Sequence, residues 1–260
     1  MATKTKATKT KATKKVTTKD LADNPVPRLA SCLVLDTSYS MNGKRGDSMK
    51  PIDELNKGVA MYMKAIAEKE KTREMVEIAI ITFGSKEFSK VSTGDPKKGV
   101  KKIMDFAHVE DQDVPTFTAY GYTPMGEAVE TALDMIEERK QEYKDNVGTY
   151  RQPWLVLMTD GYPYDYESSM NELGKYHGNS IKNPATRTSK LVKDEKLTVI
   201  PIALGDDANT DILKKFSPND NPVKINNLNF EDFFRFLSES QSDPDKGFIR
   251  GDSPDLEEII

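Results

Sequence analysis

Four short, continuous apolar runs constrain the fold of this chain more than any other feature. They occupy residues 29–36, 76–84, 154–160 and 197–205, and each is long enough for one strand. A strand that is apolar on both faces must be covered on both faces, which is typical of a parallel sheet between two layers of helices. The four runs therefore predict the central strands of such a sheet.

The segments between these runs have the spacing of amphipathic helices. Apolar side chains recur every three or four positions in residues 51–68 and 124–140, and each segment begins with a proline, which the first helical turn tolerates. Shorter helices are expected in residues 183–195 (N-cap Asn183), 209–216 and 229–237 (N-cap Asn229).

The alternation of strands and helices predicts a doubly wound α/β fold, with helices flanking a mostly parallel central sheet. We expect residues 88–91 to add one short antiparallel edge strand. The domain is expected to span residues 26–241. Residues 1–25, rich in Lys, Thr and Ala, predict a disordered leader, and residues 242–260 predict an acidic, flexible tail.

The charge of the chain is unevenly distributed. The net charge is −4, but the first 20 residues carry seven Lys and one Asp, which leaves about −10 on the remainder. An acidic domain disfavours nucleic acid as a specific partner. The basic leader could bind nucleic acid only weakly and in a salt-dependent manner, because it has no aromatic residue to stack on a base.

Several features predict a cytoplasmic protein without a membrane partner. The sequence has no apolar run long enough to cross a bilayer, and its N-terminus lacks the apolar stretch of a signal peptide. Its single cysteine, Cys32, lies in an apolar run, which favours a buried, inert thiol in a reducing compartment. We expect a monomer.

Oxygen-bearing side chains gather where the predicted strands end. The run that ends at Asp36 is followed by Ser38 and Ser40, another run ends at Asp160, and Thr123 directly precedes a predicted helix. In a doubly wound sheet, ligands bind outside the carboxyl ends of the strands. A set of carboxylates and hydroxyls suits Mg²⁺ or Mn²⁺ and does not suit zinc or copper.

Each motif taken alone has a simpler interpretation. Ser, Thr and Asp at a junction between a strand and a helix often only cap the helix, and Asp-x-Ser-x-Ser is a common string. Three such segments in order, each at the end of a strand or the start of a helix, favour a metal site.

The segments "DTSYS", "GYTPMGEA" and "LMTDGYP" resemble the three parts of the metal-ion-dependent adhesion site of von Willebrand factor A (VWA) domains. The stretch "NPVPRLASCLVLDTSYSM", followed by "PIDELNKGVAMYMKAI", is similar to the cytoplasmic bacterial subfamily of YegL-like and TerY-like proteins, the latter associated with tellurite resistance. The resemblance extends over residues 24–240 and implies a Rossmann-like VWA fold.

The resemblance also implies a function and a set of ligands. Ser38 and Ser40 would bind the metal directly, Thr123 directly or through water, and Asp36 and Asp160 mainly through water. An acidic side chain of a partner protein would complete the coordination. The chain would then be a non-enzymatic protein-interaction module of a bacterial stress-response or signalling system.

An enzyme is the main alternative. Asp36 at a strand end resembles the phosphoryl-accepting aspartate of Mg²⁺-dependent phosphotransferases and hydrolases, but Ser38 stands where such enzymes usually carry a second Asp. No Walker-type loop and no Gly-x-Ser-x-Gly motif occurs. A serine hydrolase needs a histidine, and the two in the chain, His108 and His177, lie in polar stretches where we expect solvated side chains.

Overall fold

The computed structural model of the chain describes residues 26–43, 50–89, 95–146, 149–160, 162–164, 181–205, 208–217, 222–225, 230–246 and 256–258. The expected leader, His177 and the expected N-cap Asn229 lie outside these residues.

The described strands form one sheet in the order β3-β2-β1-β4-β5-β6-β7. They are β1 (Leu29–Asp36), β2 (Val76–Phe83), β3 (Val100–Ala107), β4 (Trp154–Thr159), β5 (Thr198–Leu204), β6 (Val223–Ile225) and β7 (Leu256–Glu258). The five central strands are parallel, and the two edge strands, β3 and β7, are antiparallel to their neighbours. The predicted mostly parallel α/β sheet is thereby confirmed.

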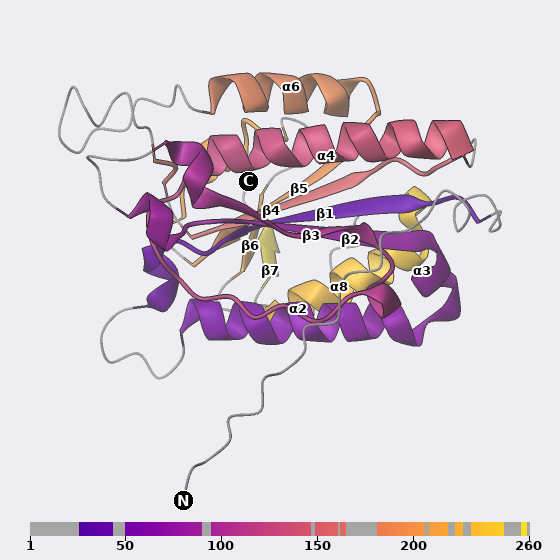
Figure 1. Cartoon of the computed structure of the whole chain (residues 1–260), viewed down its shortest axis with the longest axis horizontal. Helices are drawn as coiled ribbons and strands as arrows, with labels where there is room; N and C mark the ends of the chain where they lie inside the picture. The colour runs from indigo at the N-terminus through magenta and orange to yellow at the C-terminus, as the bar shows by residue number, and fades with distance from the viewer. Residues whose placement is uncertain are drawn as a thin grey trace, which may run out of the picture.

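Helices cover both faces of the sheet (Figure 1). On one face lie α4 (Met125–Asn146) and α6 (Lys182–Lys193), and on the other lie α2 (Pro51–Glu68), α3 (Glu70–Met75) and α8 (Phe230–Ser242). The remaining helices are α7 (Thr210–Leu213) and the 3₁₀ helices η1 (Tyr39–Asn42), η2 (Lys86–Phe88), η4 (Pro96–Gly99), η5 (Val109–Asp111) and η7 (Pro244–Lys246). None of the helices in the described part of the chain is both long and apolar enough to cross a bilayer.

The central strands divide their side chains between two hydrophobic cores. Along β1, Leu33 and Leu35 join the core beneath α2 and α8, whereas Cys32 and Val34 join the core beneath α4. Every residue of β1, β2 and β4 is buried, as the continuous apolar runs predict. Burial raises the pKa of the Cys32 thiol well above its usual range.

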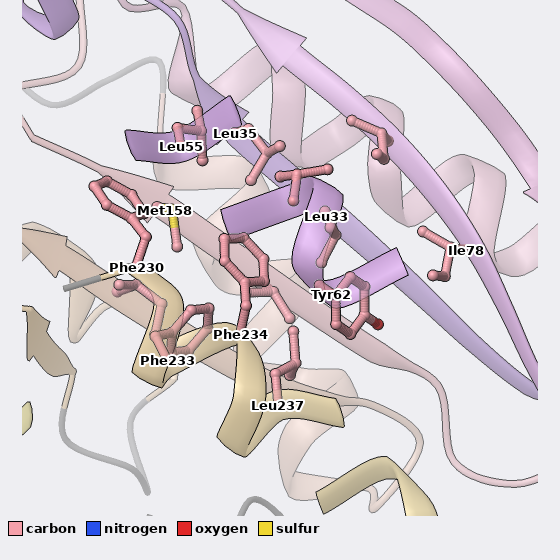
Figure 2. Packing of buried hydrophobic residues seen from close by; sticks show 14 of the residues in the cluster. Leu33, Leu35, Leu55, Tyr62, Ile78, Met158, Phe230, Phe233, Phe234 and Leu237 are labelled. Carbon is pink, nitrogen blue, oxygen red and sulfur yellow. The ribbon is translucent and has the colours of Figure 1, made fainter. Parts of the chain in front are cut away.

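Helix α8 packs closely against α2 (Figure 2). A Cβ added at Gly58 of α2 would lie 2.5 Å from Cδ2 of Phe234, so the absence of a side chain permits this contact. The hydroxyl of Tyr62 donates to Oε1 of Gln241 at 2.7 Å, and Nε2 of Gln241 donates to the Ser31 hydroxyl at 2.8 Å. These buried hydrogen bonds fix the position of α8 along its axis.

The amino-terminal half of β2 carries a buried charge. The carboxylate of Glu77 is fully buried and accepts hydrogen bonds from Nε of Arg139 at 2.7 Å and from the hydroxyl of Tyr143 at 2.5 Å. His108 lies nearby, with Nε2 2.5 Å from Nη1 of Arg28, and its side chain is only 17% exposed. The prediction of a solvated His108 is therefore wrong, because the histidine belongs to this polar network.

Three further predictions need correction. Residues 88–91 do not form the antiparallel edge strand: Phe88 ends η2, residues 90–91 lie outside the described residues, and β3 is the edge strand. Asn183 is not the N-cap of α6, which begins at Lys182. Helix α4 runs six residues beyond the predicted end at Lys140, because its last turns bring Tyr143 to Glu77. Apart from these three corrections, β7 lies within residues 242–260, where the sequence predicted a tail.

We expect Glu77→Ala to lower the free energy of unfolding by about 3 kcal/mol, because the buried guanidinium of Arg139 loses its buried carboxylate and keeps only that of Glu142, which is 54% exposed. Glu68→Ala is the control, since Glu68 pairs with Lys64 on the exposed surface of α2, and its effect should stay within about 1 kcal/mol. Urea denaturation followed by circular dichroism measures both. Equal urea midpoints for Glu77→Ala and the parent would contradict the prediction.

Candidate metal centre

The site forms where the strand order reverses. From β1 the chain proceeds outward to β2 and β3, and then returns to place β4 on the other side of β1. The parallel register pairs Leu35 with Met158, so Asp36 ends β1 beside Thr159, and Asp160 follows at the same edge. Such a reversal leaves a crevice outside the carboxyl ends of the strands.

Asp36 is held by both of its carboxylate oxygens. Oδ1 accepts from the backbone N–H of Ser38 at 2.8 Å, and Oδ2 accepts from the hydroxyl of Thr159 at 2.6 Å. The side chain is fully buried. Its orientation is therefore fixed by the neighbouring strand and by the turn that follows it.

Three further oxygens form a chain that leads from the interior to the surface. The hydroxyls of Ser38 and Ser40 lie 3.0 Å apart, and Ser40 donates to Oδ1 of Asp160 at 2.8 Å. Ser38 is buried and Ser40 is exposed. Neighbouring ligands of an octahedral Mg²⁺ ion, at about 2.05 Å from the metal, lie about 2.9 Å from each other. The spacing of these oxygens therefore fits such an ion.

The loop that carries Thr123 lies against both other segments. The N–H of Tyr39 donates to the carbonyl of Gly121 at 3.0 Å, and the N–H of Tyr164, four residues after Asp160, donates to the carbonyl of Thr123 at 2.8 Å. Among the contacts of the described residues, none joins the Thr123 side chain to the other four predicted ligands. The structure thus brings four side chains together and holds the backbone of the fifth residue near them.

The two carboxylates affect each other electrostatically. Burial, and next the negative charge of Asp160, raise the pKa of Asp36 to about 7, although the hydrogen bonds from Thr159 and Ser38 oppose this shift. A cation between the two carboxylates would favour their charged forms. No group of three or more His, Cys, Asp or Glu side chains with metal-binding geometry occurs in the described part of the chain, so the oxygens at this site are two carboxylates with hydroxyls.

Sequence reasoning missed the residues that shape the site without being predicted ligands. Gly84 directly follows β2 and has φ +113°, and a Cβ there would lie 2.4 Å from the backbone nitrogen of Ser38. The hydroxyl of Thr37 donates to the carbonyl of Gly84 at 3.0 Å. The sequence signal was the glycine that ends the run 76–84. Its role required knowing that β1 and β2 are neighbours.

Solved structures share this fold. The pilus adhesin SpaC from Lactobacillus rhamnosus GG matches with a TM-score of 0.58 and 15% identity, covering 84% of this chain and 31% of SpaC. A von Willebrand factor type A protein from Catenulispora acidiphila matches with a TM-score of 0.55 and 13% identity, covering 83% of this chain and 43% of that protein. The chain spans less than half the length of these two proteins.

A third structure corresponds to a single domain. The von Willebrand factor domain of the type V pili tip protein Mfa5 from Porphyromonas gingivalis matches with a TM-score of 0.52 and 12% identity, covering 88% of this chain and 99% of that domain. At these identities the likeness shows the fold alone. No curated protein sequence matches the chain significantly.

The sequence also matches a family model. The model of the von Willebrand factor type A domain covers residues 32–242, which include Asp36 at one end of the candidate site and Asp160 at the other. The match extends over most of the chain, from within β1 to the end of α8. The chain therefore belongs to the von Willebrand factor type A domain family.

Proposed function

We propose that this protein is a non-enzymatic interaction module that binds a partner protein through a divalent metal ion, Mg²⁺ or Mn²⁺. The observation that carries the proposal is the chain of oxygens from Ser38 through Ser40 to Asp160, spaced 3.0 and 2.8 Å apart. Domains of this family commonly bind a divalent metal at a metal-ion-dependent adhesion site and mediate protein–protein interaction.

The proposed ligands divide by their charge and position. Ser38 and Ser40 bind the ion directly, Thr123 directly or through water, and Asp36 and Asp160 mainly through water. When bound, the ion supplies a positive charge. Because its protein ligands are only two carboxylates and neutral hydroxyls, the ion can attract a further anionic ligand. An acidic side chain of the partner fits that position, because Ser40 places the proposed site at the exposed end of the oxygen chain.

Two features of Asp36 support a binding role over phosphoryl transfer. A carboxylate that attacks phosphorus needs an accessible oxygen, whereas both oxygens of Asp36 already accept hydrogen bonds and the side chain is fully buried. Ser38 occupies the position two residues later, where a second Asp would be expected in such enzymes.

We further propose that the protein belongs to the cytoplasmic bacterial YegL-like and TerY-like type and serves a stress-response or signalling system. The proposal rests on the sequence around Asp36, residues 24–66, and on the single, buried Cys32, which suits a reducing compartment. The fold itself occurs in pilus proteins as well, so it does not determine the compartment.

We expect isothermal titration calorimetry with MgCl₂ or MnCl₂ to show one site, and Asp36→Ala to weaken binding by about 10- to 100-fold, because the loss of an outer carboxylate typically has this effect. Asp211→Ala is the matched control, since Asp211 is exposed on α7 and should leave the affinity unchanged. Metal binding by Asp36→Ala as tight as that of the parent would refute the site.

We also expect the metal-free protein to become less stable as the pH rises from about 4 to about 7. The folded state raises the pKa of Asp36 from 3.8 to about 7, so stability present below the lower value is lost as the pH approaches the upper one. Urea unfolding in EDTA should show a decrease of at least about 1 kcal/mol relative to Asp36→Ala over this range.

Added Mg²⁺ should reduce this loss at neutral pH, because a bound cation favours the charged carboxylate, and metal affinity should fall in acid as protons compete. If the parent and Asp36→Ala showed the same pH dependence in EDTA, the raised pKa would not belong to Asp36.

A further inference from the structure

A pocket of about 280 Å³ opens beside the candidate metal centre. Its lining includes Thr37, which directly precedes Ser38, and Gly84, whose carbonyl accepts a hydrogen bond from the Thr37 hydroxyl at 3.0 Å. Most of the remaining lining residues come from η2, from the edge strand β3 and from the loop before α4. The pocket therefore shares a wall with the loop that carries two of the proposed metal ligands.

Among the described residues, one lysine that lines the pocket has no carboxylate partner. Nζ of Lys101 lies 3.0 Å from Oε2 of Glu87, and the hydrogen bond from Lys101 is the main cause that lowers the pKa of Glu87 to about 2. Lys86 is exposed, and its Nζ lies 4.3 Å from the ring centroid of Tyr120. Among the described residues, no carboxylate forms an ion pair with Lys86. Lys86 is therefore available in this pocket to pair with a further anion.

The walls of the pocket suit a side chain better than a free small molecule. Its volume lies just below the range of roughly 300–1,000 Å³ that is usual for small-ligand pockets. Tyr120 is 40% exposed and Ile103 is 39% exposed, so the pocket offers an aromatic and an aliphatic surface next to Lys86. An acidic side chain could place its methylene groups on these surfaces and its carboxylate at the lysine.

We propose that this pocket is a second recognition site for the same partner, and that the partner presents an acidic loop with two carboxylates. This inference rests on the proposed function: one carboxylate completes the metal site, and the second pairs with Lys86 while the methylene groups of its side chain pack beside Tyr120. The pocket thereby selects partners with two nearby acidic residues over partners with one.

The charges favour a carboxylate over a phosphate as the second group. Glu87 lies in the same wall and would repel a doubly charged phosphate more strongly than a singly charged carboxylate. One available lysine also matches one negative charge.

Peptide display provides the probe for a test. Random peptides are selected on the full chain in MgCl₂ and eluted with EDTA, and one selected peptide is synthesised for fluorescence anisotropy. We expect two acidic residues in it. Replacing one by its amide should abolish metal-dependent binding, and replacing the other should weaken binding by about 5-fold, the scale of an exposed ion pair.

The protein variants identify the group that the second carboxylate meets. Lys86→Ala should weaken binding of the parent peptide by the same factor of about 5. Replacing the second carboxylate by its amide should then weaken binding to Lys86→Ala no further, because the two changes remove the same interaction. Lys86→Arg should restore most of the binding. Lys98→Ala is the matched control, since Lys98 is an exposed lysine of η4 that does not line the pocket. Thermal melting checks that all variants fold.

Two negative results separate the inference from the proposed function. If EDTA abolishes binding while Lys86→Ala binds every selected peptide as the parent does, the second site is refuted and the metal-dependent function stands. If selection yields no peptide whose binding depends on metal and on an acidic residue, the proposed function fails, and the second site fails with it.

Discussion

The parallel pairing of β1 with β4 is the constraint on which the rest of the structure depends. It brings together the ends of two strands that are 123 residues apart in the sequence, so that the hydroxyl of Thr159 donates a hydrogen bond to Asp36. Because parallel neighbours need long crossovers, the chain must run helices over both faces of the sheet, and these helices supply the two cores. The loops that bear Ser38, Thr123 and Asp160 meet at one edge as a consequence.

The candidate centre shows how a buried acid can be kept at the end of a hydrophobic strand. Asp36 receives two hydrogen bonds, which offset part of the cost of its burial, yet the nearby Asp160 adds repulsion. The hydroxyls of Ser38 and Ser40 add donor oxygens without adding charge. Under the proposed function, a bound cation relieves the repulsion between the two carboxylates. Because the site supplies only two negative charges, the bound cation can still attract a third carboxylate.

The sequence predicted the parts of the fold whose signal is local. The continuous apolar runs of β1, β2, β4 and β5 indicated buried strands directly. The apolar side chains at every third or fourth position indicated α2. The edge strand β3 was missed because an exposed edge carries charges, here Lys101 and Lys102, which hide the strand pattern. The burial of His108 and the role of Gly84 could not be predicted, because both depend on contacts between residues far apart in the sequence: His108 with Arg28, and Gly84 with Ser38.

The buried position of Cys32 has a practical consequence for work on this surface. It is the only cysteine of the chain, it is fully covered between β2 and β4, and its thiol resists ionisation. Maleimide dyes and thiol-reactive spin labels react with accessible thiolates, so we expect the folded protein not to react with them. A cysteine introduced at Tyr39, which is 72% exposed beside the centre, would be the sole reactive handle, and fluorescence or spin spectroscopy could follow the approach of a partner without any prior removal of native thiols.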